Sequence, residues 1–137
     1  MRDFSKYINI PYKHLGRSFS GCDCYGIIVL IFKEELGIKL NDYTELQYDK
    51  DWHEQGKNHI IENITSDWIK IDKPYKIFDC ILFFGRHGSC IANHIGLYIG
   101  EDKFIHISSV YSSMVSRLDS YWEPKIYSVM RYRNLGA

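Results

Sequence analysis

Cys22 and Cys24 stand one residue apart in the stretch GCDCYGIIVLIF, directly before the longest apolar run of the chain. That run predicts a buried helix over residues 24–36, with Gly37 at its C-terminal cap. Cys24 would then lie at the helix start, where free backbone N–H groups and the helix dipole stabilise a thiolate. Gly26 permits another backbone segment to approach closely. Cys22 is interpreted as a turn or loop residue.

Two histidines occupy the stretch HIGLYIGEDKFIHIS, which predicts two strands joined by the turn residues Gly-Glu-Asp. A three-residue connection would pair Ile99 with Lys103, and His106 would then lie opposite Gly96. Because side chains alternate along a strand, His94 and His106 would share one face, roughly 7–8 Å apart at the backbone. Gly96 would leave room between the two rings. A shift of one residue would put the histidines on opposite faces.

A cysteine at a helix start and two histidines on one sheet face are the parts of an activated thiol nucleophile. The thiolate is the reactive form, a neighbouring histidine takes the proton, and a second polar group orients that histidine. We therefore expect Cys24 to be the thiol with a low pKa, and the other cysteines to behave as ordinary thiols. A structural role for the cysteine and for the histidine pair stays open at this point.

A zinc site would use the same residue types. The possible ligands are Cys22, Cys24, Cys80, Cys90, His94 and His106. One residue separates the first two cysteines, whereas two residues are common between zinc-binding cysteines, and no second close pair follows. We therefore expect no metal and no other cofactor.

The elements that must position these residues are one early helix and several short strands. Residues 41–67 are polar and aromatic with weak periodicity, which predicts an irregular excursion with one short helix near 58–64. The strands predicted after it are 80–84, 94–99, 103–107 and 125–133. Their spacing is too short for helical crossovers, so the pattern predicts an α+β fold with an antiparallel sheet. A length of 137 residues fits a single domain over 1–137.

Composition limits the function classes. Lysine plus arginine number 17 and aspartate plus glutamate number 17, so the chain lacks the basic excess expected of a general nucleic-acid binder. The longest apolar run, Ile27 to Phe32, is too short to span a bilayer. The N-terminal sequence lacks the apolar region of a signal peptide, so we expect cytoplasmic synthesis without a signal peptide.

Four segments in order resemble the NlpC/P60 family of papain-like cysteine peptidases. The family's nucleophile motif, approximately G-x-D-C-S-G-L, is similar to GCDCYGI, and its segment H-V-G-I-Y-L-G-x-G-x-F-I-H-A-S is similar to HIGLYIGEDKFIHIS. PYKHLGRS resembles the family's segment upstream of the nucleophile, and WIKIDKPYKIFDCILFF resembles its stretch ending in G-D-L-V-F-F. The resemblance runs from about Pro11 to Arg133, where VSRLDSYWEPKIYSVMRYR is similar to the closing strands.

The resemblance implies a papain-like α+β fold, in which the Cys24 helix packs on an antiparallel sheet that carries both histidines. It implies amide hydrolysis through a thioester, with Cys24 as the nucleophile, His94 as the base and His106 as the residue that orients His94. The backbone N–H of Cys24 is the expected oxyanion donor. The residues that it assigns to oxyanion stabilisation or substrate binding are Tyr12, Asp23 and Tyr25.

The substrate class that the resemblance implies is a peptidoglycan stem peptide, often cut at the γ-D-glutamyl–diamino-acid bond. Tyr25 stands where the family usually has serine, and we expect its ring at the edge of the cleft, where it narrows the space for a substrate's N-terminal end. Phe78 replaces the glycine before Asp79, and Met114 falls where glycine is common. A thiol acyltransferase or amidase acting on a lipid or another small amide is the alternative enzyme.

The resemblance also includes small members encoded by bacteriophages. The chain shows no cell-wall-binding repeat and no export signal, which indicates a location in the virion tail, tail-tip proteins as partners and action on the cell wall. A catalytically idle tail component is the alternative outside the enzymes.

Overall fold

The computed structural model describes residues 2–40, 67–84, 92–108 and 110–135. Its helical elements are η1 (Ser5–Tyr7), α1 (Gly26–Ile31), the π-helical turn η2 (Phe32–Leu36), η5 (Glu123–Lys125) and η6 (Arg133–Leu135). Its strands are β1 (Arg17–Ser18), β2 (Gly21–Cys22), β3 (Trp68–Lys70), β4 (Cys80–Phe84), β5 (Ala92–Gly100), β6 (Lys103–His106), β7 (Met114–Arg117) and β8 (Ile126–Tyr132). The short helix expected near 58–64, and residues 41–66 of the excursion, lie outside the described residues.

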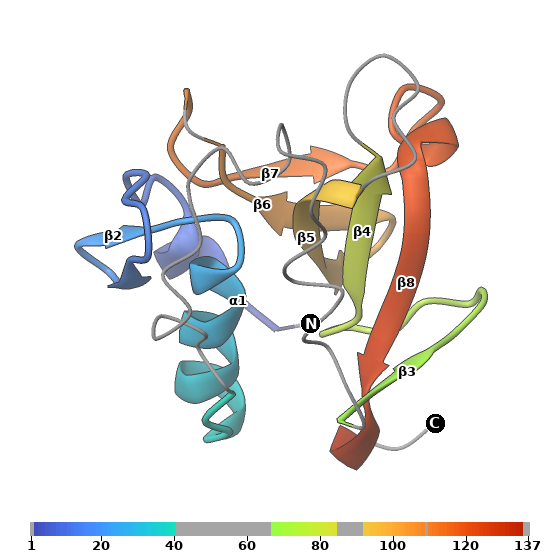
Figure 1. The fold of residues 1–137 in the computed structure, drawn as a ribbon, viewed down its shortest axis with the longest axis horizontal. Coiled ribbons are helices and arrows are strands. Elements are labelled where there is room, and N and C mark those ends of the chain that lie inside the picture. The colour runs from blue at the N-terminus through green and yellow to red at the C-terminus, as the bar shows by residue number, and fades with distance from the viewer. Residues whose placement is uncertain (1, 41–66, 85–91, 109, 136–137) are drawn as a thin grey trace.

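The six larger strands form one sheet in the order β3-β8-β4-β5-β6-β7, and every neighbouring pair is antiparallel. Figure 1 shows α1 and the small β1–β2 hairpin together on one side of this sheet. The predicted α+β class with a helix packed on an antiparallel sheet is therefore confirmed. All four predicted strands form, whereas β3 and β7 are too short to leave a clear alternation in the sequence.

The helix expected at 24–36 begins two residues late and changes its winding before it ends. Residues from Gly26 to Ile31 are all buried, which explains the unbroken apolar run. The last turn is π-helical, and Gly37 follows with a φ of +66°, a left-handed conformation that glycine adopts at little cost. The N–H groups of Gly37 and Ile38 donate to the carbonyls of Lys33 and Phe32, which closes the helix end. The predicted glycine cap is confirmed.

The β5–β6 hairpin has the predicted register where the histidines lie. Leu97 pairs with Ile105, so Gly96 lies opposite His106, as expected. The predicted pair at the turn is wrong by one residue, because Lys103 pairs with Gly100 across a local bulge. The two turn residues that remain both have positive φ, which matches the twist of tight hairpins.

Two hydrophobic clusters cover the two faces of the sheet. The helix side contains α1 together with the sheet residues Cys80, Leu82, Ile95, Leu97, Ile105 and Ile107. The opposite side contains Ile81, Phe83, Tyr98, Phe104, Leu118 and Val129, with Trp122 packed against them. Since side chains alternate along each strand, neighbouring residues of β5 and β6 belong to different clusters.

A buried ion pair joins the start of β4 to β8. Both carboxylate oxygens of Asp79 accept hydrogen bonds from Arg131, from Nε and Nη2, each at 2.8 Å.

The residue before Asp79 is Phe78, whose φ of +80° is a conformation that favours glycine. The ring of Phe78 is buried and lies edge-on to Phe4 and Phe32, with centroids 6.0 and 5.9 Å away. Aromatic packing therefore accompanies a backbone conformation that phenylalanine rarely adopts.

Candidate active site

Cys24 lies in the turn that leads into α1. The first helical hydrogen bond runs from the N–H of Ile27 to the carbonyl of Asp23, so the chain turns toward the helix around Cys24. The Cys24 side chain is half-buried and packs against the cluster on the helix side of the sheet. Cys22 is fully buried within β2, where its thiol donates to the Ser18 carbonyl at 3.1 Å. The interpretation of Cys22 as a loop residue is therefore wrong, since that segment pairs with β1.

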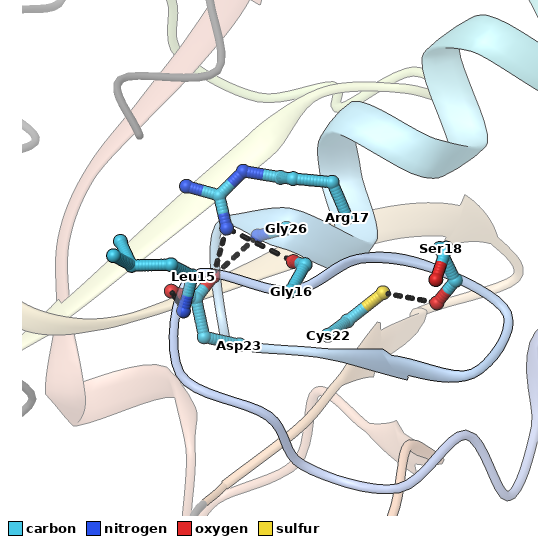
Figure 2. A network of polar contacts seen from close by, with 7 residues as sticks. All are labelled: Leu15, Gly16, Arg17, Ser18, Cys22, Asp23 and Gly26. Atoms are coloured by element: carbon cyan, nitrogen blue, oxygen red, sulfur yellow. Dashed lines mark hydrogen bonds and ion pairs between the residues drawn. The ribbon is translucent and has the colours of Figure 1, made fainter. Parts of the chain in front are cut away.

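Asp23 anchors the turn through a network that Figure 2 shows from close by. One carboxylate oxygen accepts from the Gly26 N–H at 2.7 Å and from Arg17 Nη1 at 2.8 Å, and the other accepts from the Leu15 N–H at 3.0 Å. The side chain is only 2% exposed. Asp23 thus ties the first residue of α1 to the segment that contains Leu15 and Arg17. Its assignment to oxyanion stabilisation or substrate binding stays a prediction.

Gly26 is required by the packing of this loop on the helix. A Cβ atom on Gly26 would overlap the Gly16 carbonyl oxygen and would lie 2.9 Å from Arg17 Nη1. The expected close approach of another backbone segment is confirmed. Figure 2 shows Gly16 and Arg17 lying against the helix start.

The two tyrosines assigned to the substrate-binding region occupy different environments. Tyr12 is half-buried and forms a backbone bridge with Cys22, so it runs beside the segment that leads to Cys24. The ring of Tyr25 is 2% exposed and belongs to the core, with the Arg17 guanidinium 5.6 Å from its centroid. The expectation that the Tyr25 ring lies at an open cleft edge is wrong, because the ring turns inward at the helix start. The roles of both tyrosines toward a substrate stay predictions.

The two histidines meet, as the hairpin register predicts. His94 Nε2 lies 2.8 Å from His106 Nδ1, and the ring centroids are 5.1 Å apart. The space over Gly96 is filled by Phe104, since a Cβ on Gly96 would lie 2.7 Å from that ring. The two histidine rings therefore pack beside Phe104, which fills this space.

Sequence reasoning missed two residues around this pair. Ser116 Oγ lies 2.8 Å from His106 Nε2, on the side of the ring opposite His94. Trp122 stacks on His94 at 6.2 Å and stands edge-on to His106 at 5.2 Å. Ser116 could have been found only by predicting β7 and its register, and Trp122 comes from the connection after β7.

The electrostatics of the site favour neutral groups. Burial lowers the pKa of His106 to about 4, and burial followed by the charge of His106 lowers the pKa of His94 to about 3. Burial and then Asp23 raise the pKa of Cys24 to about 12, against smaller opposing effects of Arg17 and of backbone N–H groups. The expected low pKa of Cys24 is therefore wrong, because loss of hydration outweighs the stabilisation of a thiolate.

The thiol and the histidines have different packing neighbours. Cys24 packs with the helix-side cluster, whereas the rings of His94 and His106 contact Phe83, Phe104 and Trp122 on the opposite side. Among the residues that the structure describes, no hydrogen bond joins the Cys24 thiol to either histidine. The described contacts thus hold the two histidines together, and they include no hydrogen bond between this pair and the Cys24 thiol.

The comparisons with known proteins agree with these features of the fold. The model of the family described as NlpC/P60 matches residues 9–131. This chain belongs to the NlpC/P60 family. The match includes the cysteine turn, the hairpin with both histidines and β8, so the resemblance inferred from the sequence is confirmed at the level of the family.

Two curated relatives of this NlpC/P60 chain have names that describe hydrolases. It is 30% identical to the gamma-DL-glutamyl hydrolase of Bacillus subtilis (strain 168), over 98% of this chain and 29% of the relative. It is 26% identical to the murein DD-endopeptidase MepS/murein LD-carboxypeptidase of Escherichia coli (strain K12), over 96% of this chain and 60% of the relative. The chain thus spans less than two thirds of each of these proteins.

Solved structures show the same fold. The NlpC/p60 domain of the peptidoglycan hydrolase SagA superposes with a TM-score of 0.56 at 20% identity, over 92% of this chain and 89% of that one. NlpC2 from Trichomonas vaginalis gives a TM-score of 0.67 at 19% identity, over 93% of this chain and 44% of that one. These likenesses establish the NlpC/P60 fold.

Within the described ranges, no group of three or more His, Cys, Asp or Glu side chains comes together as metal ligands would. Cys22, Cys24 and Cys80 are free thiols, and Cys90 lies outside the described residues. The part of the chain that the structure describes contains no helix long and apolar enough to cross a bilayer.

Proposed function

We propose that this NlpC/P60 chain is a cysteine endopeptidase that hydrolyses amide bonds of peptidoglycan stem peptides. The names of the two curated relatives support this substrate class, since one describes a glutamyl hydrolase and the other a murein endopeptidase. We propose that the chain cuts the γ-D-glutamyl–diamino-acid bond. Cys24 is the nucleophile, His94 the base and His106 the residue that orients His94.

The contact between the two histidines carries the proposal. His94 Nε2 is engaged with His106, which leaves Nδ1 as the ring nitrogen that can take a proton. A base whose ring is held by a second residue is the arrangement that activates a nucleophile. Because the pKa of His94 is lowered, the ring is neutral at pH 7 and its lone pair is available.

The chemistry follows from a neutral thiol and a neutral histidine. Cys24 Sγ attacks the carbonyl carbon as its proton moves to His94 Nδ1, so that no separate thiolate has to form in a buried place. The C–N bond breaks, the leaving amine takes the proton from His94, and a thioester remains. Water then attacks the thioester carbon as His94 takes one water proton. The C–S bond breaks, His94 returns that proton to Sγ, and the acid and the Cys24 thiol are released. The mechanism requires Sγ and Nδ1 to come within hydrogen-bond reach when substrate is bound.

The negative charge on the carbonyl oxygen needs donors beside Cys24. We propose the backbone N–H of Cys24 as the main donor, assisted by the hydroxyl of Tyr12. Asp23 supports this donor indirectly, because its hydrogen bonds to the N–H groups of Gly26 and Leu15 fix the turn. A tightly held turn keeps the N–H pointing in one direction during the reaction.

Digestion of purified peptidoglycan by matched variants tests the proposal. Wild type should release new amino groups and shortened stem peptides, identified by mass spectrometry, and Cys24→Ser should release none. Cys22→Ser is the control, because serine keeps a donor to the Ser18 carbonyl. Equal activity of wild type and Cys24→Ser would refute the thiol mechanism. Transfer of an acyl group to an added amine without hydrolysis would instead favour the acyltransferase.

A place in a phage tail is a separate proposal that rests on the resemblance to family members encoded by bacteriophages. The two curated relatives described above come from bacteria. If the chain is a tail component, mass spectrometry of purified virions should detect it together with tail-tip proteins. Its detection only in host cell extracts would contradict this location.

A further inference from the structure

Ser116 is the last of three side chains that follow one another through hydrogen-bond distances, in the order His94, His106, Ser116. It belongs to β7, and its register partner on β6 is Phe104. Its Oγ lies 2.8 Å from His106 Nε2, and the other nitrogen of that ring lies 2.8 Å from His94 Nε2. Three side chains from three neighbouring strands thus form one continuous polar line.

The line runs through apolar surroundings. His106 is 6% exposed, with Phe104 at 4.6 Å and Trp122 at 5.2 Å between ring centroids. Among the described residues that contact the His106 ring, which come from β5, β6, β7 and the segment before η5, His94 is the one titratable group. Ser116 is the polar partner that the described structure provides for Nε2, and a buried N–H without a partner is costly.

If both histidines are neutral, their ring protons can be arranged in two ways along His94, His106 and Ser116. A neutral histidine has one N–H and one bare nitrogen. If His106 donates from Nε2 to Ser116, its Nδ1 accepts from His94 Nε2, and His94 Nδ1 is bare. If Ser116 donates instead, His106 donates from Nδ1, and His94 carries its proton on Nδ1, where it cannot act as a base. Which atoms donate and which accept in these hydrogen bonds therefore decides whether His94 is a base.

The protonated state of His94 permits only the first arrangement. An imidazolium donates from both nitrogens, so His106 Nδ1 must accept and His106 Nε2 must carry the proton. That proton requires an acceptor in an apolar place, and Ser116 Oγ lies at the right distance. Ser116 is half-buried, so its own hydroxyl proton can be donated to water.

We propose that Ser116 is a positioning residue, which accepts the His106 Nε2 proton and thereby keeps His94 Nδ1 bare for the thiol proton. The inference rests on the proposed function of His94 as the base. It extends the working site by one residue, onto β7.

Nitrogen NMR of the full chain labelled with ¹⁵N-histidine measures the arrangement without any reaction. At pH 7 the wild type should show His106 protonated at Nε2 and His94 protonated at Nε2. In Ser116→Ala, a share of both rings should move to the Nδ1-protonated form, because the acceptor is lost. Ser116→Thr keeps a hydroxyl and should retain the wild-type spectrum.

Kinetics give an independent measurement on the same variants. Ser116→Ala should lower kcat on the order of tenfold with little change in KM, since the loss falls on the imidazolium formed during the reaction. Ser116→Thr should restore most of the rate. Ser128→Ala is the matched control, because Ser128 is also half-buried in a strand but lies beside Met130 and should keep the wild-type rate.

The outcomes separate the two proposals. Wild-type His106 protonated at Nδ1 would overturn the role of Ser116, and this measurement needs no variant to fold. Unchanged tautomers and rates in Ser116→Ala would overturn it as well. Tautomers that move in Ser116→Ala, in a protein whose wild type cuts no peptidoglycan, would support the positioning role and refute the proposed function.

Discussion

The buried histidine pair should make the stability of this protein depend on pH, and substitution of His106 should reduce that dependence. Burial lowers the pKa of His106 from an ordinary value of 6.5 to about 4, and the ring is 6% exposed. In the unfolded chain the same ring takes a proton near pH 6.5. Below that pH the unfolded state binds a proton that the folded state does not, so acid favours unfolding.

The magnitude follows from the difference between the two pKa values. Each pH unit between 6.5 and 4 costs about 1.4 kcal/mol of unfolding free energy for one such histidine. The stability is fully present above pH 6.5 and falls as the pH drops toward 4. At pH 4.5 the loss from His106 should reach about 2.5 kcal/mol. His94, whose pKa is lowered to about 3, acts in the same direction.

Urea unfolding followed by tryptophan fluorescence at pH 7.5, 6.5, 5.5 and 4.5 measures this loss. His106→Gln has no ring to protonate, so its unfolding free energy should fall less steeply than that of wild type. Subtracting the two curves cancels the carboxylates that both proteins share. If the difference in unfolding free energy between wild type and His106→Gln is the same at pH 7.5 and 4.5, the reasoning is refuted.

The remaining predictions concern the thiol, the turn, the ion pair and metals. Since burial and the neighbouring aspartate raise the pKa of Cys24 to about 12, its alkylation by iodoacetamide should still accelerate with pH above 8; a plateau below pH 8 would contradict this. Gly26→Ala should lower the unfolding free energy by about 2 kcal/mol through overlap with the facing carbonyl, whereas Gly37→Ala, with open space around it, should cost about 1 kcal/mol; equal losses in thermal melts would argue against the overlap. Asp79→Asn should lower the unfolding free energy, measured with urea, by about 3–5 kcal/mol, because it leaves Arg131 buried without its counter-ion. The double variant Asp79→Leu with Arg131→Met should recover most of that free energy. A loss well below about 3 kcal/mol in Asp79→Asn would refute this reasoning. Peptidoglycan cleavage should survive dialysis against EDTA, and a loss restored by zinc would favour a metal site.

Local pattern determined the elements of this protein and the meeting of its histidines. The apolar run and Gly37 predicted the buried helix and its end, because a chain without polar side chains must bury every face. Alternation along β5 and β6 placed His94 and His106 on one face, because a strand repeats every two residues and a short hairpin leaves few registers. These features depend on residues close in sequence, and the structure differs from them in one pairing at the turn, in the later start of the helix and in its π-helical last turn.

The tertiary structure decided the environment of each group. Ser116 and Trp122 reach the histidines only because β7 pairs with β6 and the chain after it folds back over the sheet, which are contacts between distant segments. The inward turn of Tyr25 and the raised pKa of Cys24 depend on how much of each side chain the rest of the fold covers. Sequence specifies which groups can react, but dehydration, which sets their proton affinity, is a property of the packed molecule.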